Sequence, residues 1–361
     1  MDTLPSLVII FTAGIGILVA ALVSLISNGR AVFVREGNKK ILKGSLPSQP
    51  YIFYMAIKKS LFGKKSKSTK LPDVQLVQKS ISLDEVNLSK YRKICGFSAE
   101  NDVPITYHYL TIFPLQALLL VDKAFPFQAM GLVHLANRIQ QFKQMKSSDK
   151  VTAVVKFDQT VVPHEKGYCF TVVSELFDDS TDELLWRSES TYLFRTKASK
   201  GAEGKLYEST VKPEDVTGVE KRHQWDIPGD FSRKYASVSG DYNPIHLYGV
   251  TAKLFGFPHG CIMHGMWSIA ACSAVIMPVI SKDTMKIESS TGGALAEIYV
   301  EMKLPMYVPA TPTLFCTEAT VKKSSTHSSS TFEVSVNKKG KKGDIVPHLR
   351  GKCSWLSMSK N

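Results

Sequence analysis

The stretch Leu7–Ser27 limits the possible folds most, because it holds 21 residues without a single charge. About 20 apolar residues cross the hydrocarbon core of a bilayer as a helix. A cleaved signal peptide would begin with a positive region and have a shorter apolar core, whereas this chain begins Met-Asp-Thr-Leu-Pro. We therefore predict that residues 1–29 form a single-pass transmembrane anchor.

Most of the net charge of +13 lies next to this stretch. Residues 30–70 contain eleven Lys or Arg and one acid, Glu36, so the rest of the chain is nearly balanced. Positive charge beside a hydrophobic segment indicates an anionic membrane surface and not nucleic acid. Because this charge lies on the C-terminal side of the stretch, the positive-inside rule places the body of the protein in the cytosol.

Residues 30–72 are predicted to form a basic juxtamembrane linker. Tyr51–Ile57 is apolar and aromatic, and lysines follow it. Two interpretations stay open: an amphipathic segment lying on anionic lipid, or a solvated tether.

The six cysteines are scattered and form no CxxC pair. Zinc and thioredoxin-type sites therefore have no support in their spacing. No Gly-rich phosphate loop or metal-ligand spacing occurs elsewhere, so we predict neither a cofactor nor a metal.

The rest of the chain divides into two segments with a similar order of elements. These are residues 73–200 and 216–361, joined by a charged linker at 201–215. In the first segment, Phe125–Met145 predicts a long helix, and alternating patterns predict strands at 74–83, 151–157, 167–177 and 183–195. In the second, a long apolar helix is predicted from His264 to about Ile280, ahead of strands at 294–304, 313–323, 330–339 and 346–357.

A long helix followed by antiparallel strands indicates a helix wrapped by a curved sheet. Pattern alone therefore predicts an α+β protein with two similar halves. The run FPFQAMGLVHLA loosely repeats FPHGCIMHGMWSIA of the second half, which would place His134 near the position of His264.

An acid and a base lie close together in the segment Ser239–His246. Asp241 and His246 would not share a face of a helix, but Asn243-Pro244 between them favours a bend. A carboxylate and an imidazole converging there could orient and deprotonate one water. The alternative is an ordinary surface turn, in which Asp241 caps a local helix and His246 packs beside it.

The string S-G-D-Y-N-P-I-H, followed by H-G-M at His264–Met266, resembles the hydratase motif of the MaoC-like, or (R)-specific enoyl-CoA hydratase, family. The resemblance covers about residues 220–357. It implies a hot-dog fold, here a double hot-dog in one chain. It also implies addition of water across the 2,3 double bond of a trans-2-enoyl thioester, giving the (R)-3-hydroxyacyl product, and the reverse dehydration.

The resemblance implies a role for each matching residue. Asp241 and His246 would be the catalytic pair that shares one water, and Asn243 would hold the turn. Gly265 would donate its backbone N–H to the thioester carbonyl at the positive end of a long helix. Two residues keep alternatives: His264 either contacts substrate or is packed at the helix start, and Ser273 either faces the site or bonds to the backbone.

Taken together, these features predict a membrane-anchored hydratase or dehydratase with one active site, in the second half. Its partners would be an acyl-CoA or acyl-carrier-protein thioester and membrane lipid, with a homodimer possible and no nucleic acid. Two alternatives are a non-catalytic acyl-thioester or lipid-binding scaffold and a hot-dog thioesterase. The intact set Asp241, Asn243 and His246 favours the hydratase, because a scaffold has no need of all three.

Overall fold

The computed structural model describes the chain apart from its two ends and several short internal gaps. The described residues are 31–62, 68–98, 103–196, 206–285, 294–318, 320–321, 327–337 and 344–357. The predicted anchor Leu7–Ser27 lies outside these ranges. Within them, no helix is both long enough and apolar enough to cross a membrane.

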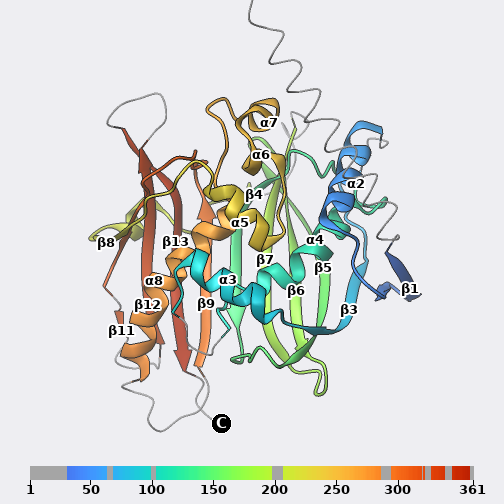
Figure 1. Cartoon of the computed structure of the whole chain (residues 1–361), viewed down its shortest axis with the longest axis horizontal. Coiled ribbons are helices and arrows are strands. Elements are labelled where there is room, and N and C mark those ends of the chain that lie inside the picture. Colours follow the sequence, from blue (N-terminus) through green and yellow to red (C-terminus); the bar gives the residue numbers. More distant parts are fainter. Residues whose placement is uncertain are drawn as a thin grey trace, which may run out of the picture.

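The described strands form one sheet of 13 strands, in the order β1-β2-β3-β5-β6-β7-β4-β9-β13-β12-β10-β8, with β11 paired to β12 (Figure 1). The first half supplies β3 (Gln75–Ser82), β4 (Val133–Gln141), β5 (Lys150–His164), β6 (Gly167–Asp178) and β7 (Leu184–Arg195). The second half supplies β8 (Glu220–Gln224), β9 (Ala294–Met302), β10 (Thr313–Cys316), β11 (Thr320–Val321), β12 (His327–Asn337) and β13 (Ile345–Ser357).

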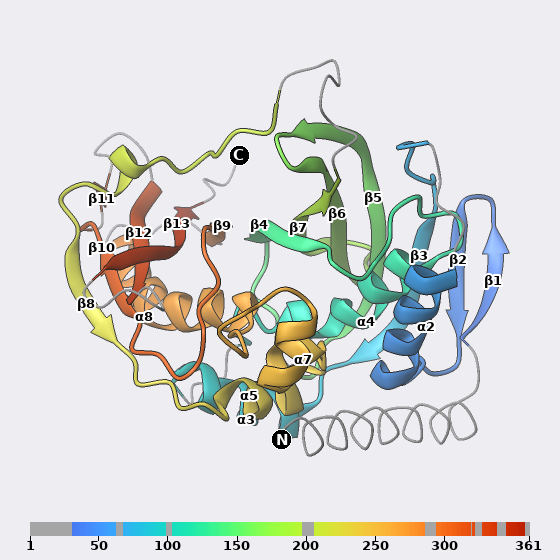
Figure 2. The ribbon, with the colours of Figure 1, turned by 90° about the horizontal axis from the view of Figure 1, so that it is seen from above.

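The two halves repeat one plan outward from the centre of the sheet. The first half runs β4-β7-β6-β5-β3 and the second β9-β13-β12-β10-β8. Each half lays one long helix inside the curve of its strands, α4 (His108–Val121) in the first and α8 (Gly265–Met285) in the second (Figure 2). This is the α+β double hot-dog arrangement that the resemblance implies.

Shorter helices lie on the outer side of the two long ones. They are α3 (Glu85–Cys95), α5 (Phe231–Ser239), α6 (Pro244–Leu247) and α7 (Gly249–Leu254). A 3-10 turn, η2 (Pro213–Val216), lies instead against β12, where the Thr331 hydroxyl donates to the Asp215 carbonyl oxygen at 2.8 Å. Tyr91 of α3, Tyr235 of α5 and Trp267 of α8 belong to one buried cluster. The short helices thus cover the start of α8, where the predicted site lies.

The long helix of the first half is α4, so the helix predicted at Phe125–Met145 is wrong. Ile112, Leu115 and Leu119 of α4 are fully buried at helical spacing. The helix is apolar on nearly all sides because it packs between the sheet and a further helix, and such a helix lacks the polar stripe that marks an amphipathic one. Pro114 inside it further weakens the helical signal.

Part of the wrongly predicted helix is the central strand β4. Gly131 has φ 88°, which a helix does not allow, and it ends the loop before the strand. Buried positions then alternate at Asn137, Ile139 and Gln141. His134 therefore lies on a strand. By the repeated plan, Tyr107-His108 at the start of α4 corresponds to His264-Gly265 at the start of α8.

The predicted linker at residues 30–72 contains folded elements, and it is therefore more than a tether. Strands β1 (Val32–Glu36) and β2 (Lys39–Lys43) form a hairpin, and β2 pairs with β3. Helix α2 (Gln49–Phe62) follows, and its Ile52 and Ala56 pack against Val121 of α4. Neither of the two interpretations describes Ile52 and Ala56, because these side chains pack on protein.

Lys59 fastens α2 to the end of α4. Its Nζ donates to the backbone carbonyls of Leu120 at 3.2 Å, Asp122 at 2.7 Å and Phe125 at 2.9 Å. The last carbonyls of a helix have no partner within it and carry the negative end of the helix dipole. The ammonium group satisfies this end of α4. Lys40 of β2 adds an ion pair with the Asp122 side chain.

The predicted linker at residues 201–215 is described from residue 206 and lies against β9. Glu301 of β9, which is 3% exposed, accepts hydrogen bonds from the Ser209 hydroxyl and the Thr210 backbone N–H. These bonds hold the connection close to the sheet.

We predict that Lys59→Met lowers the free energy of unfolding of the protein, because it leaves carbonyls at the end of α4 without their donor. The expected loss is about 1–3 kcal/mol, measured by urea denaturation. Lys58→Met is the matched control, since Lys58 is exposed on the same helix and should change stability little. Equal effects of the two variants would contradict the role of Lys59.

Candidate active site

The segment from Ser239 to His246 is a bend between two helices. α5 ends at Gly240, whose φ of 75° suits glycine, and its N–H donates to Ala236 O. Asn243 caps the short helix α6, whose first residue is Pro244. The Asn243 N–H donates to the Asp241 carboxylate at 3.1 Å. The bend predicted from Asn-Pro is confirmed, and it orients the Asp241 side chain.

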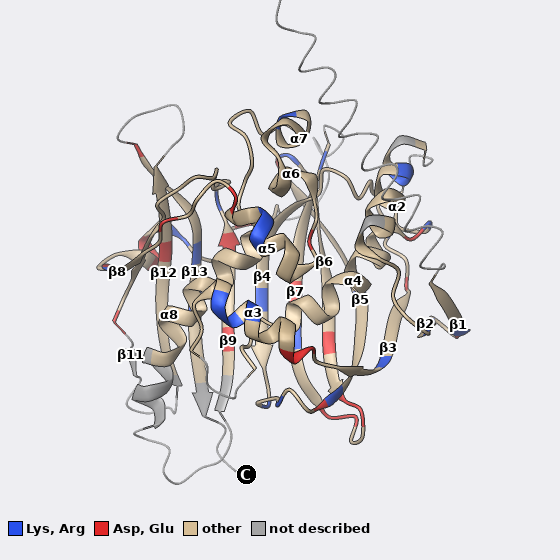
Figure 3. Ribbon diagram, in the orientation of Figure 1, with Lys and Arg blue, Asp and Glu red and all other residues tan. Residues whose placement is uncertain are grey.

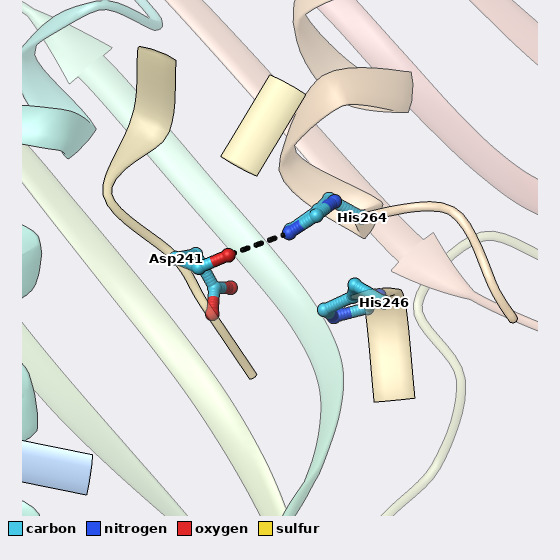
Figure 4. A group of neighbouring side chains, drawn as sticks. All are labelled: Asp241, His246 and His264. Atoms are coloured by element: carbon cyan, nitrogen blue, oxygen red, sulfur yellow. Dashed lines mark hydrogen bonds between the residues drawn. The ribbon is translucent and has the colours of Figure 1, made fainter. Parts of the chain in front are cut away.

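Three titratable side chains meet at this bend. Ligand atoms of Asp241, His246 and His264 all lie within 4.8 Å of one another (Figure 4). His246 and His264 are 8% and 2% exposed, and Asp241 is half-buried. These donor types could also hold a divalent transition metal, so a test of the site has to include a chelator.

The tautomer of His246 follows from its hydrogen bond. His246 Nδ1 lies 2.8 Å from the Ile262 carbonyl oxygen, which can only accept, so Nδ1 carries the proton. The other nitrogen of the neutral ring, Nε2, then has a free lone pair. Burial lowers the pKa of His246, and the Asp241 carboxylate offsets part of this effect. His246 is therefore a neutral base at physiological pH.

His264 holds the backbone of Asp241. Its Nε2 lies 3.0 Å from the Asp241 carbonyl oxygen (dashed in Figure 4) and donates to it. The His264 ring stacks on the His246 ring, with 3.8 Å between centroids. Burial and the adjacent His246 hold the pKa of His264 well below its usual range. His264 is thus a neutral positioning residue that fixes Asp241 relative to His246.

Gly265 is the first residue of α8, where backbone N–H groups have no partner within the helix. A Cβ at this position would lie 2.8 Å from Cε of Met302 in β9. The structure therefore gives a packing reason for glycine here, besides the predicted donation by its N–H.

Ser273 bonds to the backbone, which was the second of its two interpretations. It is fully buried, and its hydroxyl donates to the Ala270 carbonyl at 2.8 Å. Eight residues along α8 from Gly265, it lies about 12 Å further down the helix axis. The structure does not bring its hydroxyl to Asp241 and His246.

Two tyrosines of the first half lie close enough to Asp241 for its charge to raise their pKa values, and the sequence analysis missed both. The hydroxyls of Tyr109 on α4 and Tyr192 on β7 lie 3.4 Å apart. Burial raises the pKa of Tyr192 to about 12, and the Asp241 carboxylate adds to the effect. The Asp241 charge also contributes to the raised pKa of Tyr109, after burial and Tyr192. No local motif marks these tyrosines, because only the pairing of the two halves brings them near Asp241.

A cavity of about 1300 Å³ lies beside the bend. Asn243 and Ile245, which flank Pro244, line one end of it, together with Phe255 and Phe257. Elsewhere its lining comes from the first half and from α2. The space therefore runs from the Asp241–His246 bend to the N-terminal elements.

Comparison with known proteins agrees with this geometry. Residues 211–291 match the MaoC like domain family. The matched segment includes every residue predicted for the site, namely Asp241, Asn243, His246, His264, Gly265 and Ser273.

Relatives and solved structures extend the likeness beyond the matched segment. The chain is 29% identical over 252 residues to 3-hydroxyacyl-thioester dehydratase X of Mycobacterium tuberculosis, covering 70% of this chain and 83% of that protein. A crystal structure of HtdX from Mycobacterium tuberculosis is similar with a TM-score of 0.56 at 25% identity, covering 78% of this chain and 99% of that chain. A MaoC-like dehydratase from Phytophthora capsici has a TM-score of 0.58 at 14% identity, covering 82% and 98%, which shows a shared fold.

We predict that stability decreases as the pH falls below about 6.5, the usual pKa of histidine. Burial lowers the pKa of His108 to about 3 and of His348 to about 4, and it also lowers those of His246 and His264. The unfolded chain then binds protons that the folded one does not, so stability rises with pH in this window and is lost on acidification.

The measurement is the melting temperature of the protein at pH 7.5 and pH 5.5. His108→Phe should flatten the dependence, because both ring nitrogens of His108 lack hydrogen-bond partners. His223→Gln, at an exposed position, is the control. A melting temperature that rises on acidification would contradict the prediction.

Proposed function

We propose that the chain is a hydratase or dehydratase that interconverts trans-2-enoyl and 3-hydroxyacyl thioesters. One observation carries the proposal: the Asp241 carboxylate and the His246 imidazole converge, and the His246 proton is fixed on Nδ1 by Ile262. An acid–base pair with one free basic nitrogen suits the addition or removal of water. The name of the dehydratase relative supports the same chemistry.

In the hydration direction, a water bound between the two side chains is the nucleophile. His246 Nε2 accepts a proton from it as the new C3–O bond forms, and the electrons of the double bond shift towards the thioester carbonyl. The proton taken up by His246 is then passed to the Asp241 carboxylate and from it to C2. One water is consumed, its oxygen and one hydrogen go to C3 and its other proton is matched by the one added at C2, and both side chains return to their starting states. The (R) configuration of the product is part of this proposal.

Negative charge builds up on the thioester carbonyl oxygen during this step. The N-terminus of α8, with the Gly265 N–H, is the group proposed to stabilise it, because free N–H groups and the helix dipole both favour an anion. His264 contributes indirectly, since its bond to the Asp241 carbonyl oxygen fixes the position of the carboxylate.

We predict that Asp241→Asn and His246→Asn each reduce hydration of crotonyl-CoA by at least about 100-fold, measured as loss of enoyl absorbance. Both changes preserve local hydrogen bonds. Asn at 241 still accepts from the Asn243 N–H, and Asn at 246 still presents a donor towards the Ile262 carbonyl. A lost rate then reports lost acid–base chemistry and not a lost fold.

His259→Ala, at an exposed position of the connection between α7 and α8, is the matched control and should keep the wild-type rate. Chiral analysis of the product tests the (R) configuration, and incubation with a chelator tests a metal requirement. Release of free thiol would identify a thioesterase. Binding of the thioester without turnover would identify a scaffold.

We further propose that Leu7–Ser27 anchors the protein in a membrane, which is supported by its 21 uncharged residues. The double variant Leu18→Arg/Leu22→Arg should move the full chain from the membrane to the soluble fraction, because each arginine costs about 3 kcal/mol at the centre of a spanning helix. Fractionation after a carbonate wash measures this. Retention of the variant on membranes would contradict the anchor.

A further inference from the structure

The described side chains that line the cavity beside the candidate site carry a net positive charge. Among the described residues that line it are four cations and no Asp or Glu, and the cations are Lys58, Lys59, Lys123 and Arg195. They come from α2, from the loop after α4 and from the end of β7. Figure 3 marks basic residues in blue on the ribbon of α2. A cavity lined by one sign of charge favours ligands of the opposite sign.

Three of these cations are available to a ligand. Lys58, Lys123 and Arg195 are exposed, and among the described residues none of their side chains forms an ion pair or a hydrogen bond. Other cations of the same half are paired, as in Lys156 with Glu175 at 2.7 Å. The three side chains thus form a group of unpaired charges at one cavity.

Lys59, which also lines the cavity, has a different role. Its three bonds to backbone carbonyls occupy the negative end of α4, which would otherwise oppose an anion in the cavity. These bonds also fix α2, so Lys58 stands on a helix that is held in place.

The same cavity has aromatic walls. Phe127 and Phe194 stack with 4.9 Å between centroids, and both line the cavity with Phe125. Asn243 and Ile245 of the bend line the same cavity. A ligand suited to this lining would carry an anionic group for the cations and an apolar or planar part for the aromatic side chains, with its reactive group near the bend.

We propose that this cavity binds the phosphorylated pantetheine arm that carries the acyl thioester, with Lys58, Lys123 and Arg195 binding its phosphate. The inference rests on the proposed function, because it takes the ligand to be a thioester. Phosphate suits these cations through charge-assisted hydrogen bonds, and Arg195 can bind it through two parallel bonds. The arm occurs in coenzyme A, with further phosphates on its nucleotide, and on carrier proteins, with one phosphate.

The test uses the full-length protein with a triple variant, Lys58→Ala/Lys123→Ala/Arg195→Ala. For crotonyl-CoA we expect KM to rise by about tenfold to hundredfold with kcat nearly unchanged, because the lost contacts lie away from the reacting atoms. For crotonyl-pantetheine, which has no phosphate, KM should not change. The matched control is Lys90→Ala/Lys93→Ala/Lys146→Ala, which removes the same charge from exposed positions outside the cavity.

Crotonyl-phosphopantetheine distinguishes the two sources of the phosphate. An equal rise in KM for this substrate and for crotonyl-CoA means that the cations bind the phosphate of the arm, which carrier proteins share. A rise for crotonyl-CoA alone places the nucleotide phosphates there. An unchanged KM for both substrates overturns the proposal.

Calorimetric binding of coenzyme A separates this inference from the proposed function. Wild-type protein that binds coenzyme A, together with a triple variant that does not, supports the cationic site even if no hydration occurs. Wild-type protein that hydrates crotonyl-CoA, together with a triple variant of unchanged KM and affinity, refutes the cationic site and leaves the hydratase intact.

Discussion

The pairing of β4 with β9 is the contact on which the rest of the structure depends. Six residue pairs, from Ala136 opposite Glu301 to Gln141 opposite Ala296, join the two halves at the centre of the sheet. Ile139 and Ile298 face each other in this register and are almost fully buried. The core is therefore continuous across the join. This same contact brings side chains of the first half up to a site whose acid and base belong to the second.

How far the fold could be predicted depends on where each element lies. The strands β5, β6 and β7 could be predicted because apolar and polar residues alternate along parts of them. Helix α8 could be predicted because a long apolar run follows a recognisable turn. The helix α4 and the strand β4 were missed. α4 is buried on nearly all sides and contains Pro114, so it has no amphipathic pattern. β4 is central to the sheet, and of its two partners, β7 and β9, the latter lies about 160 residues away along the chain.

The residues of the site likewise divide into those that the sequence could predict and those that it could not. Asp241, Asn243 and His246 could be predicted because a turn of a few residues carries their geometry. The bond from His264 to the Asp241 backbone and the bond from His246 to Ile262 link residues 23 and 16 apart, so only the folded chain shows them. Tyr109 and the cations of the cavity are harder still to predict, because elements from different parts of the fold bring them together. Local chemistry can thus be predicted from sequence, but the surroundings that select a substrate cannot.

Repeating one plan about β4 and β9 yields a sheet that, among the described strands, is open and has two edges. At one edge lies β8, with the sequence EKRHQ and all five residues exposed. Another chain adding a strand there would have to strip water from Glu220, Lys221 and Arg222, which discourages edge-to-edge aggregation. The other edge ends in β1, where Val32 and Val34 are exposed. Protection against unwanted sheet growth is therefore unequal at the two edges of the molecule.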